Sequence, residues 1–426
     1  MAVTAVVGAN WGDEGKGKII DALAAESDYV VRFQGGSNAG HTVINGYGKF
    51  ALHLLPSGVF HPAVGNVIGP GVALDVEVLQ AELQMLAERG VPAPKLHISD
   101  RAQIVLPVHR LLDGLEEERL GSKSFGSTRR GIAPFYADKY LKLGIQTAEL
   151  ADGRALQGRL QQLLDQKNVL LAHLYGQQPI DPAAWAEGLA EQGQWLAPYL
   201  CDTTELLRKA WSGGANILLE GQLGALRDPD HGIYPFSTSS STLAGYAPVG
   251  AGLPPYAISS VTAVIKAYSS CVGAGPFVGE LLGSEGDELR RRGGDAGEYG
   301  ATTGRPRRMG WFDAVATRYG CMIQGATQTA LTNLDVLGYL DEIPVCTAYK
   351  LATGEITEQF PATARLAGAE PIMQNLPGWK CDISTVKEYA DLPEEAKQYV
   401  DFVEKSTGVP VSMVSVGPRR EQLIHR

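Results

Sequence analysis

The stretch GANWGDEGKGK at residues 8–18 decides the fold of this chain. It follows an apolar run at 3–7 that indicates a buried strand, and the residues after Lys18 have a helical pattern. A strand, a glycine-rich turn and a helix in this order surround a phosphate with backbone N–H groups at the helix N-terminus. Lys16 and Lys18 add positive charge for such an anion. The stretch therefore predicts a P-loop-like phosphate turn after the first strand.

Asp13 is unexpected inside a turn that binds anions. Its carboxylate would repel a phosphate unless it has a task of its own, such as holding Mg²⁺ or accepting a proton. Residues 12–18 satisfy G-x-x-x-x-G-K, but Ile19 stands where an ordinary P-loop has the Ser or Thr that binds Mg²⁺. The pattern thus disfavours an ordinary kinase or GTPase. The alternative to a phosphate site is a tight connecting turn that binds no ligand.

The composition is that of a globular protein, with 426 residues, 44% hydrophobic and 20% charged. A net charge of -10 argues against a nucleic-acid surface, which needs a basic footprint. Five scattered cysteines without a C-x-x-C pair indicate reduced thiols and a cytoplasmic location. We expect no membrane association, because neither a signal peptide nor a long apolar span is visible.

Short apolar runs alternate with helical patterns along the chain. The expected strands lie at 3–7, 29–33, 66–68, 96–98, 217–219, 330–334 and 411–416. The clearest helical patterns lie at 76–89, 155–168 and 182–207. Such alternation predicts an α/β fold with a mostly parallel central sheet flanked by helices. We expect residues 1–426 to form a single large domain, with a helix-rich insertion at 147–212.

A second glycine-rich segment, QGGSNAGHT at 34–42, follows the second expected strand. We expect it to lie beside the first turn, because the carboxyl ends of parallel strands meet at one edge of a sheet. His41 titrates near neutrality, so it can donate to a phosphate oxygen or move a proton. The alternative is a buried, hydrogen-bonded histidine with a structural role.

Other segments also suit the binding of anions or bases. The loop GSTRRG at 126–131 offers hydroxyls and cations to a phosphate, and EYGATTGRPRR at 298–308 offers three arginines to a carboxylate. A solvated basic surface is the alternative for both. Asp335 suits the N–H groups of a guanine edge and the turn SVGP at 415–418 suits a base, although a helix cap and a plain turn explain them too.

Together and in this order, these segments resemble the adenylosuccinate synthetase family over essentially the full chain. The resemblance rests on WGDEGKGKI at 11–19, QGGSNAGHT at 34–42, LHLLPSG at 52–58, GIAPFYADK at 131–139, DPDHGIYPFSTSS at 228–240, KAYSSCVGAGPF at 266–277, GATTGRPRRMGWFD at 300–313 and NLDVLGYL at 333–340. It implies a ligase of purine biosynthesis that joins L-aspartate to IMP, with GTP as co-substrate and Mg²⁺ as cofactor. The products are adenylosuccinate, GDP and phosphate, formed through a 6-phosphoryl-IMP intermediate.

The resemblance also implies roles for single residues. Asp13 takes the proton from ring nitrogen 1 and binds Mg²⁺ together with the carbonyl of Gly40, His41 acts as general acid, and Lys16 offsets charge on the transferring phosphoryl group. The nucleotide and phosphate ligands would be Gly12, Glu14, Gly15, Gly17, Lys18, Asn38, Ala39, Gly40, Thr42, Thr128, Lys142, Gln222, Thr238, Arg305, Asn333, Leu334, Asp335, Ser415, Val416 and Gly417. The aspartate ligands would be Ala301, Thr302, Thr303, Gly304, Arg305 and Arg307.

The family works as a homodimer in which a cation from the partner subunit reaches the nucleotide phosphate. That cation is usually Arg, and Lys142 stands in its place here. Three further departures affect positions that contact nucleotide: Leu223 replaces a glutamine, Asn333 replaces a frequent lysine, and Arg419 replaces an acid. Leu223 forms no hydrogen bond through its side chain, although the adjacent Gln222 is placed to take over.

These departures keep two alternatives open. The first is a related ligase that joins aspartate to another purine nucleotide, such as a guanine deoxynucleotide, or that uses ATP. The second is a nucleotide-dependent switch without ligase chemistry. Asp13, which such related ligases usually alter, disfavours the first alternative, whereas the Asp13–His41 pair and the arginine loop disfavour the second.

Overall fold

The computed structural model describes residues 2–294, 296–300 and 304–426. Its centre is a ten-stranded sheet whose neighbouring strands are parallel, apart from the antiparallel pair at one edge. From that edge to the other, the strands are β21 (Leu423–His425), β20 (Val411–Ser415), β16 (Gln328–Thr332), β11 (Ser260–Lys266), β1 (Val3–Gly8), β10 (Ile217–Gly224), β2 (Tyr29–Arg32), β5 (Gly65–Ile68), β7 (Lys95–Ser99) and β9 (Leu200–Cys201). The prediction of a mostly parallel central sheet is confirmed.

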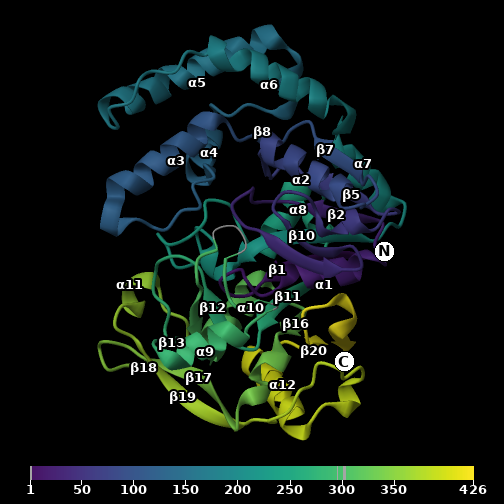
Figure 1. Cartoon of the computed structure of the whole chain (residues 1–426), viewed down its shortest axis with the longest axis vertical. Coiled ribbons are helices and arrows are strands. Elements are labelled where there is room, and N and C mark those ends of the chain that lie inside the picture. Colours follow the sequence, from purple (N-terminus) through teal and green to yellow (C-terminus); the bar gives the residue numbers. More distant parts are fainter. Residues whose placement is uncertain (1, 295, 301–303) are drawn as a thin grey trace.

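Smaller sheets lie around the central one. They are the pair β3 (His41–Asn45) and β4 (Gly48–Leu52), the pair β6 (Ala73–Leu74) and β8 (Gln103–Ile104), a sheet of β12 (Ser269–Cys271), β13 (Glu280–Leu281) and β14 (Arg308–Gly310), and a sheet of β15 (Phe312–Asp313), β17 (Glu342–Lys350), β18 (Ile356–Thr357) and β19 (Glu370–Pro377). In Figure 1, β17, β18 and β19 form the end of the molecule opposite to α5 and α6.

Helices flank the central sheet, as predicted. They are α1 (Lys16–Ala24), α2 (Val76–Glu88), α3 (Pro107–Leu120), α4 (Ile132–Leu141), α5 (Gly153–His173), α6 (Ala183–Leu196), α7 (Thr203–Ser212), α8 (Ala247–Ala251), α9 (Ser284–Arg292), α10 (Ala314–Gln324), α11 (Thr363–Leu366) and α12 (Glu394–Thr407). Within the described part of the chain, none of them combines the length and the apolar composition needed to cross a membrane.

Strand β1 is buried on both faces, which explains its unbroken apolar sequence. Val6 packs with Ile19 and Ile20 of α1 on one face, whereas Ala5 and Val7 pack on the other face with residues of α7 and α8. The apolar sequence therefore places β1 in the middle of the sheet, and the turn at 9–15 separates it from α1.

The helix-rich region at 147–212 is present and contains α5, α6 and α7 (Figure 1). The single helix expected at 182–207 is wrong in detail, because α6 ends at Leu196 and the two-residue strand β9 follows. Helix α7 then starts afresh, with the carboxylate of Asp202 accepting the N–H of Glu205 at its N-terminus. An N-cap aspartate is a start signal, and the continuous apolar pattern obscured it.

Candidate active site

The phosphate turn is held by its own acidic residue. Glu14 is 1% exposed, and its Oε1 accepts the backbone N–H groups of Asn10 and Gly12 at 3.0 and 2.7 Å. Lys16 Nζ donates to Glu14 Oε2 and to the carbonyl of Gly12, each at 3.0 Å. The backbone turns with φ of 107° at Gly12 and 86° at Gly15, values that favour glycine. Glu14, expected as a nucleotide ligand, thus shapes the turn from inside.

Strand β10 lies between β1 and β2, so the two glycine-rich segments are separated by the C-terminal end of β10. Gln222, near that end of β10, is 2% exposed; its Oε1 accepts Gly36 N at 3.1 Å, and its Nε2 donates to the carbonyls of Gly36 and Ala39 at 2.8 and 2.9 Å. The Gln222 amide therefore joins the two segments. These bonds occupy the amide that the sequence suggested as a replacement for the side chain missing at Leu223.

Leu223 has a φ of 61°, in the left-handed region that disfavours a branched side chain. Its backbone packs tightly on the phosphate turn, because a Cβ placed on Gly12 would lie 2.5 Å from the Leu223 Cα. The left-handed conformation of Leu223 and its close contact with Gly12 together fix the position of residue 223.

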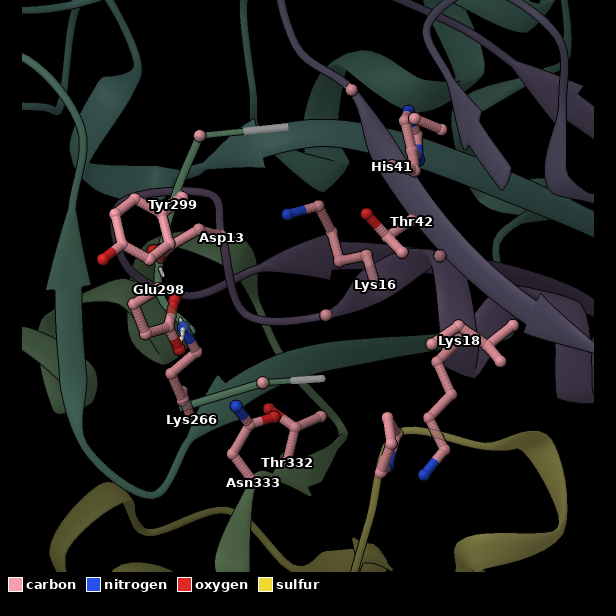
Figure 2. A pocket seen from close by; sticks show the side chains of 18 of the residues that line it. Asp13, Lys16, Lys18, His41, Thr42, Lys266, Glu298, Tyr299, Thr332 and Asn333 are labelled. Carbon is pink, nitrogen blue, oxygen red and sulfur yellow. Dashed lines mark hydrogen bonds and ion pairs between the residues drawn. The ribbon is translucent and has the colours of Figure 1, made fainter. Parts of the chain in front are cut away.

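Two cavities meet at the phosphate turn. One, of about 390 Å³, contains Lys16, His41, Asn333 and Gly417 in its wall (Figure 2). The other, of about 740 Å³, is lined by segments that include Thr128 and Thr238. The residues common to both walls are Gly12, Asp13, Ala39, Gly40, Leu223, Gly300 and Arg307. A group bound in one cavity is thus brought next to a group bound in the other.

Asp13 lies at this common wall and is surrounded by donors. Ser270 Oγ donates to Asp13 Oδ2, and the side-chain nitrogens of Lys266 and Arg307 lie 3.6 and 3.5 Å from the same oxygen. Lys266 Nζ also donates to Ser270 Oγ at 2.6 Å. The carboxylate is therefore fixed in direction while remaining part of both cavity walls.

His41 opens β3 and is held from both sides of its ring. Nδ1 lies 2.9 Å from Glu220 Oε1, and Nε2 accepts a hydrogen bond from the Arg32 guanidinium, which has only donors. Burial, with the nearby Arg32 charge, lowers the pKa of His41 to about 4, although Glu220 opposes this. Ser57 donates to Glu220 through N at 2.8 Å and through Oγ at 2.9 Å. His41 is thus a neutral, oriented imidazole at pH 7.

Glu298 collects the cations of the neighbouring loop. It accepts from Lys266 Nζ at 2.9 Å, from Tyr268 OH at 2.5 Å and from Arg307. These cations, more than offsetting burial, lower the pKa of Glu298 to about 2. Asn333 Nδ2 donates to Tyr268 OH at 2.9 Å, which connects the predicted guanine loop to this cluster. Figure 2 shows Glu298 beside Lys266 and Asp13.

The predicted base-binding residues come together at the other end of the smaller cavity. Ser415, Gly417 and Asn333 line it, and the charge of Lys18 acts on the carboxylate of Asp335. Burial raises the pKa of Asp335 to about 6. Leu334 and Val416 are fully buried in the core, so their side chains face away from a ligand. Arg419 is exposed, and its backbone N donates to Gln422 Oε1 at 3.0 Å.

The larger cavity carries the predicted contacts to the acceptor nucleotide. Asn38, Thr128 and Thr238 line it, and within the described residues the buried Oδ1 of Asn38 has no partner. Gly17 allows α1 to approach the start of β3, since a Cβ there would lie 3.0 Å from the Cβ of His41. Thr42 lines the smaller cavity. The orphaned amide oxygen points to a polar ligand beside Asn38.

The predicted aspartate site is only partly within the described residues. Ala301, Thr302 and Thr303 lie outside them. Gly304 turns with a φ of 64°, and the guanidinium of Arg305 lies beside Gly126 of the 126–131 loop. Arg307 lines both cavities. Lys142 ends α4 on the exposed surface with a φ of 65°.

The residues present fit a hard divalent cation completed by phosphate oxygens. Asp13 and Gly40 share both cavity walls, and carboxylate and carbonyl oxygens are the ligands that Mg²⁺ prefers. Among the described residues, no group of three or more His, Cys, Asp or Glu is arranged to hold a metal alone. Mg²⁺ commonly binds through one or two protein oxygens together with substrate phosphates, which agrees with this donor set.

Several residues of the site escaped the sequence analysis. Arg32, Glu220, Lys266, Ser270 and Glu298 are all buried at or under the common wall. A charged residue inside an apolar strand, as at Arg32 and Glu220, was the available signal, because such groups are seldom buried without a partner. Lys266 ends β11, a strand that the sequence analysis also missed.

The family model of adenylosuccinate synthetase matches residues 5–424 of this chain. The adenylosuccinate synthetase of Dehalococcoides mccartyi is 49% identical over 427 residues, covering 100% of each chain. That of Acidothermus cellulolyticus is 46% identical over 425 residues, covering 100% of this chain and 99% of the relative. The solved structure of fully ligated adenylosuccinate synthetase from Plasmodium falciparum has a TM-score of 0.92 and 35% identity, covering 100% of each chain.

A second solved structure is that of the cyanophage S-2L succinoaminodeoxyadenylate synthetase, bound to dGMP and dATP as an energy donor. Its TM-score is 0.58 at 19% identity, covering 100% of this chain and 95% of that chain. This likeness shows the fold alone and adds no support for a guanine deoxynucleotide acceptor. The full-length family match and the relatives of nearly half-identical sequence favour the adenylosuccinate synthetase family over the two alternatives that the sequence left open. This chain belongs to the adenylosuccinate synthetase family, the ligases that join L-aspartate to IMP with hydrolysis of GTP.

Proposed function

We propose that the two cavities are the donor and acceptor halves of one ligase site. GTP binds in the smaller cavity, IMP in the larger one, and the γ-phosphoryl group passes to oxygen 6 of IMP across their common wall. The proton on ring nitrogen 1 moves to Asp13, GDP leaves, and the amine of L-aspartate then displaces phosphate from carbon 6. The observation that carries this proposal is that Asp13 and Arg307 belong to both walls.

Lys16 and His41 act on the transferring group. Lys16 is 5% exposed and turns into the smaller cavity (Figure 2), where its charge offsets that of the phosphates. The arriving negative charge raises the pKa of His41 from its low ligand-free value, and Nε2 then turns from Arg32 to the phosphoryl group. Glu220 keeps Nδ1 occupied, so Nε2 is the nitrogen that donates.

The arginine loop binds L-aspartate. Arg307 already holds the carboxylates of Glu298 and Asp13, which resemble the two carboxylates of the substrate in charge. Arg305 lies beside the 126–131 loop and completes the pair, and the expected ligands Ala301, Thr302 and Thr303 lie outside the described residues. When bound, Mg²⁺ would be held by Asp13 and the carbonyl of Gly40 and would neutralise phosphate charge.

We further propose a homodimer in which Lys142 enters the partner's acceptor cavity. Tyr140 and Leu141, next to Lys142 in α4, are 73% and 62% exposed, although both are apolar groups that favour a protein contact. Tyr140 also lines the acceptor cavity, which brings this surface to the site. All five cysteines carry free thiols, consistent with work in the reducing cytoplasm.

The intermediate is tested with IMP labelled with ¹⁸O at position 6. Phosphorylation of that oxygen followed by displacement places the label in inorganic phosphate, whereas departure as water leaves the phosphate unlabelled. Mass spectrometry of the released phosphate gives the answer. Label in water alone would overturn the intermediate without touching the overall reaction, which is followed by adenylosuccinate formation.

The dimer is tested by mixing two inactive variants, Lys142→Met and Asp13→Asn. A mixed dimer has one site with both residues intact, so equal amounts restore about a quarter of wild-type activity. Absence of recovery, with subunit exchange verified by mass spectrometry, would contradict the partner role of Lys142.

A further inference from the structure

Lys18 points away from the phosphates that its motif is expected to bind. It lies in the first turn of α1, is 9% exposed, and extends toward the 415–418 turn, while Lys16 extends to the opposite side (Figure 2). The two lysines of the motif therefore serve different parts of the site.

The ammonium group of Lys18 is fully used by the C-terminal segment. Nζ donates to Ser415 Oγ at 2.6 Å, to the carbonyl of Gly417 at 2.5 Å and to the carbonyl of Gln422 at 3.0 Å. An ammonium has three N–H donors, so these three bonds use all of them. A phosphate oxygen would have to displace one of these acceptors to be bound by Lys18.

The acceptors belong to the turn whose wall forms the base end of the donor cavity. Ser415 and Gly417 line that cavity, and Val416 N donates to the carbonyl of Gln422 at 3.0 Å, which closes the turn. Lys18 thus binds Ser415 and Gly417 within the turn and, through the carbonyl of Gln422, the residue that closes it. Loss of the ammonium would release three contacts from one short segment.

The same charge acts on the predicted guanine acceptor. Burial pushes Asp335 toward its neutral form and lowers the pKa of Lys18 to about 7, and the attraction between the two groups opposes both shifts. A carboxylate must be ionised to accept both N–H groups of a guanine edge. Lys18 thus supports guanine binding through the turn and through the charge state of Asp335.

An ion pair also ties α1 to the hairpin of β20 and β21, outside the cavity. Arg420 donates to both carboxylate oxygens of Asp21 at 2.7 Å, and Asp21 lies one turn after Lys18 on α1. This pair offers a matched control, because its removal weakens the same contact between elements without touching the cavity wall.

We propose that Lys18 is a positioning residue for the base-binding turn and Asp335, and not a ligand of the phosphates. It sets the affinity of the site for the guanine base, whereas Lys16 serves the triphosphate. This inference rests on the use of GTP in the donor cavity.

The test compares a nucleotide with a base-free polyphosphate. For Lys18→Met we expect the KM for GTP to rise about tenfold or more, as for the loss of one to two hydrogen bonds to a charged group. The inhibition constant of inorganic tripolyphosphate should change less than about twofold, and kcat at saturating GTP should fall far less than the affinity. Lys16→Met is the phosphate control and should weaken both ligands. Equal weakening of both ligands by Lys18→Met would overturn the proposal.

Folding is monitored by urea unfolding, with Arg420→Met as the control for loosening between α1 and the hairpin. Should Lys18→Met not fold, Ser415→Ala removes one acceptor and leaves the ammonium in place. The ratio of the KM for ITP, which lacks the 2-amino group, to the KM for GTP should fall in this variant. The inhibition constant of tripolyphosphate should stay unchanged. An unaltered ratio would contradict the proposal. Formation of adenylosuccinate by the wild-type enzyme is measured in parallel, so a failure of the proposed reaction is separately visible.

Discussion

Glu220 Oε1 lies 2.9 Å from Nδ1 of His41, although Glu220 is in β10 and His41 opens β3. Both side chains are buried, and Arg32 contacts the opposite ring nitrogen. The pair fixes the tautomer and direction of the imidazole before any ligand arrives.

Glu220→Gln should lower kcat about 10- to 100-fold, as is typical when the partner that orients a functional histidine is changed. Because the charge of Glu220 raises the pKa of His41 while burial lowers it, the variant should lower that pKa further. His41 donates as an acid only while it is protonated, so the alkaline limb of the pH–rate profile, on which it loses its proton, then moves to lower pH. Ser57→Ala, which keeps the Glu220 charge, is the control and should leave the limb in place.

Asp13→Asn should lower turnover by at least about a hundredfold, because the amide neither accepts the proton nor carries the charge that binds Mg²⁺. Single-turnover phosphate release measures the effect. Ser270→Ala removes a hydrogen bond to Asp13 and should cost about tenfold or less. Comparable losses in the two variants would show that the position of Asp13 matters more than its charge.

Leu223→Gln should tighten IMP binding by about 1 kcal/mol, the net value of one hydrogen bond. Gln222 is bound to Gly36 and Ala39, so it does not already supply this contact. Steady-state KM for IMP checks the gain, and Leu223→Ala separates it from the loss of leucine volume. An unchanged KM would indicate that the side chain at 223 faces away from the purine.

Asp313→Asn should reduce the pH dependence of stability. Burial raises the pKa of Asp313 from 3.8 to about 6, so between these values the native state holds a proton that the unfolded state has released. The free energy of unfolding of the wild type therefore falls as pH rises from about 4 to 6, by on the order of 3 kcal/mol. Asn still caps α10, where Asp313 accepts Ala316 N at 2.9 Å. Urea titrations at several pH values should show a flatter curve for the variant.

The sequence predicted the parts of the fold that repeat a local pattern. The run at 3–7 became β1, and the glycine-rich turn that follows it has positive φ at Gly12 and Gly15. The strand order was beyond reach, because nothing near residue 3 indicates that β10 and β11 are its neighbours. Placement of Leu223 beside the phosphate turn follows from that order.

The residues of the candidate site likewise divide into those that the local sequence predicted and those that it did not. Asp13, Lys16 and His41 were predicted from chemistry carried by adjacent residues, and they lie around one cavity. Glu220 and Arg32, which hold His41, depend on pairing between strands far apart in sequence and were missed. The direction of Lys18 depends on a partner at the other end of the chain.

The distances in sequence across this site have a consequence during synthesis of the protein. Gln222 joins the second loop across 188 positions, Ser270 reaches Asp13 across 257, and Ser415 reaches Lys18 across 397. At 5–20 residues per second, the ribosome makes Ser415 roughly 20 to 80 s after Lys18. The nascent chain carries the nucleotide motif for that whole interval without the base-binding turn. On the proposed assignment of GTP to the smaller cavity, GTP recognition thus arises when translation is nearly finished, and a chain truncated before β20 should lack it.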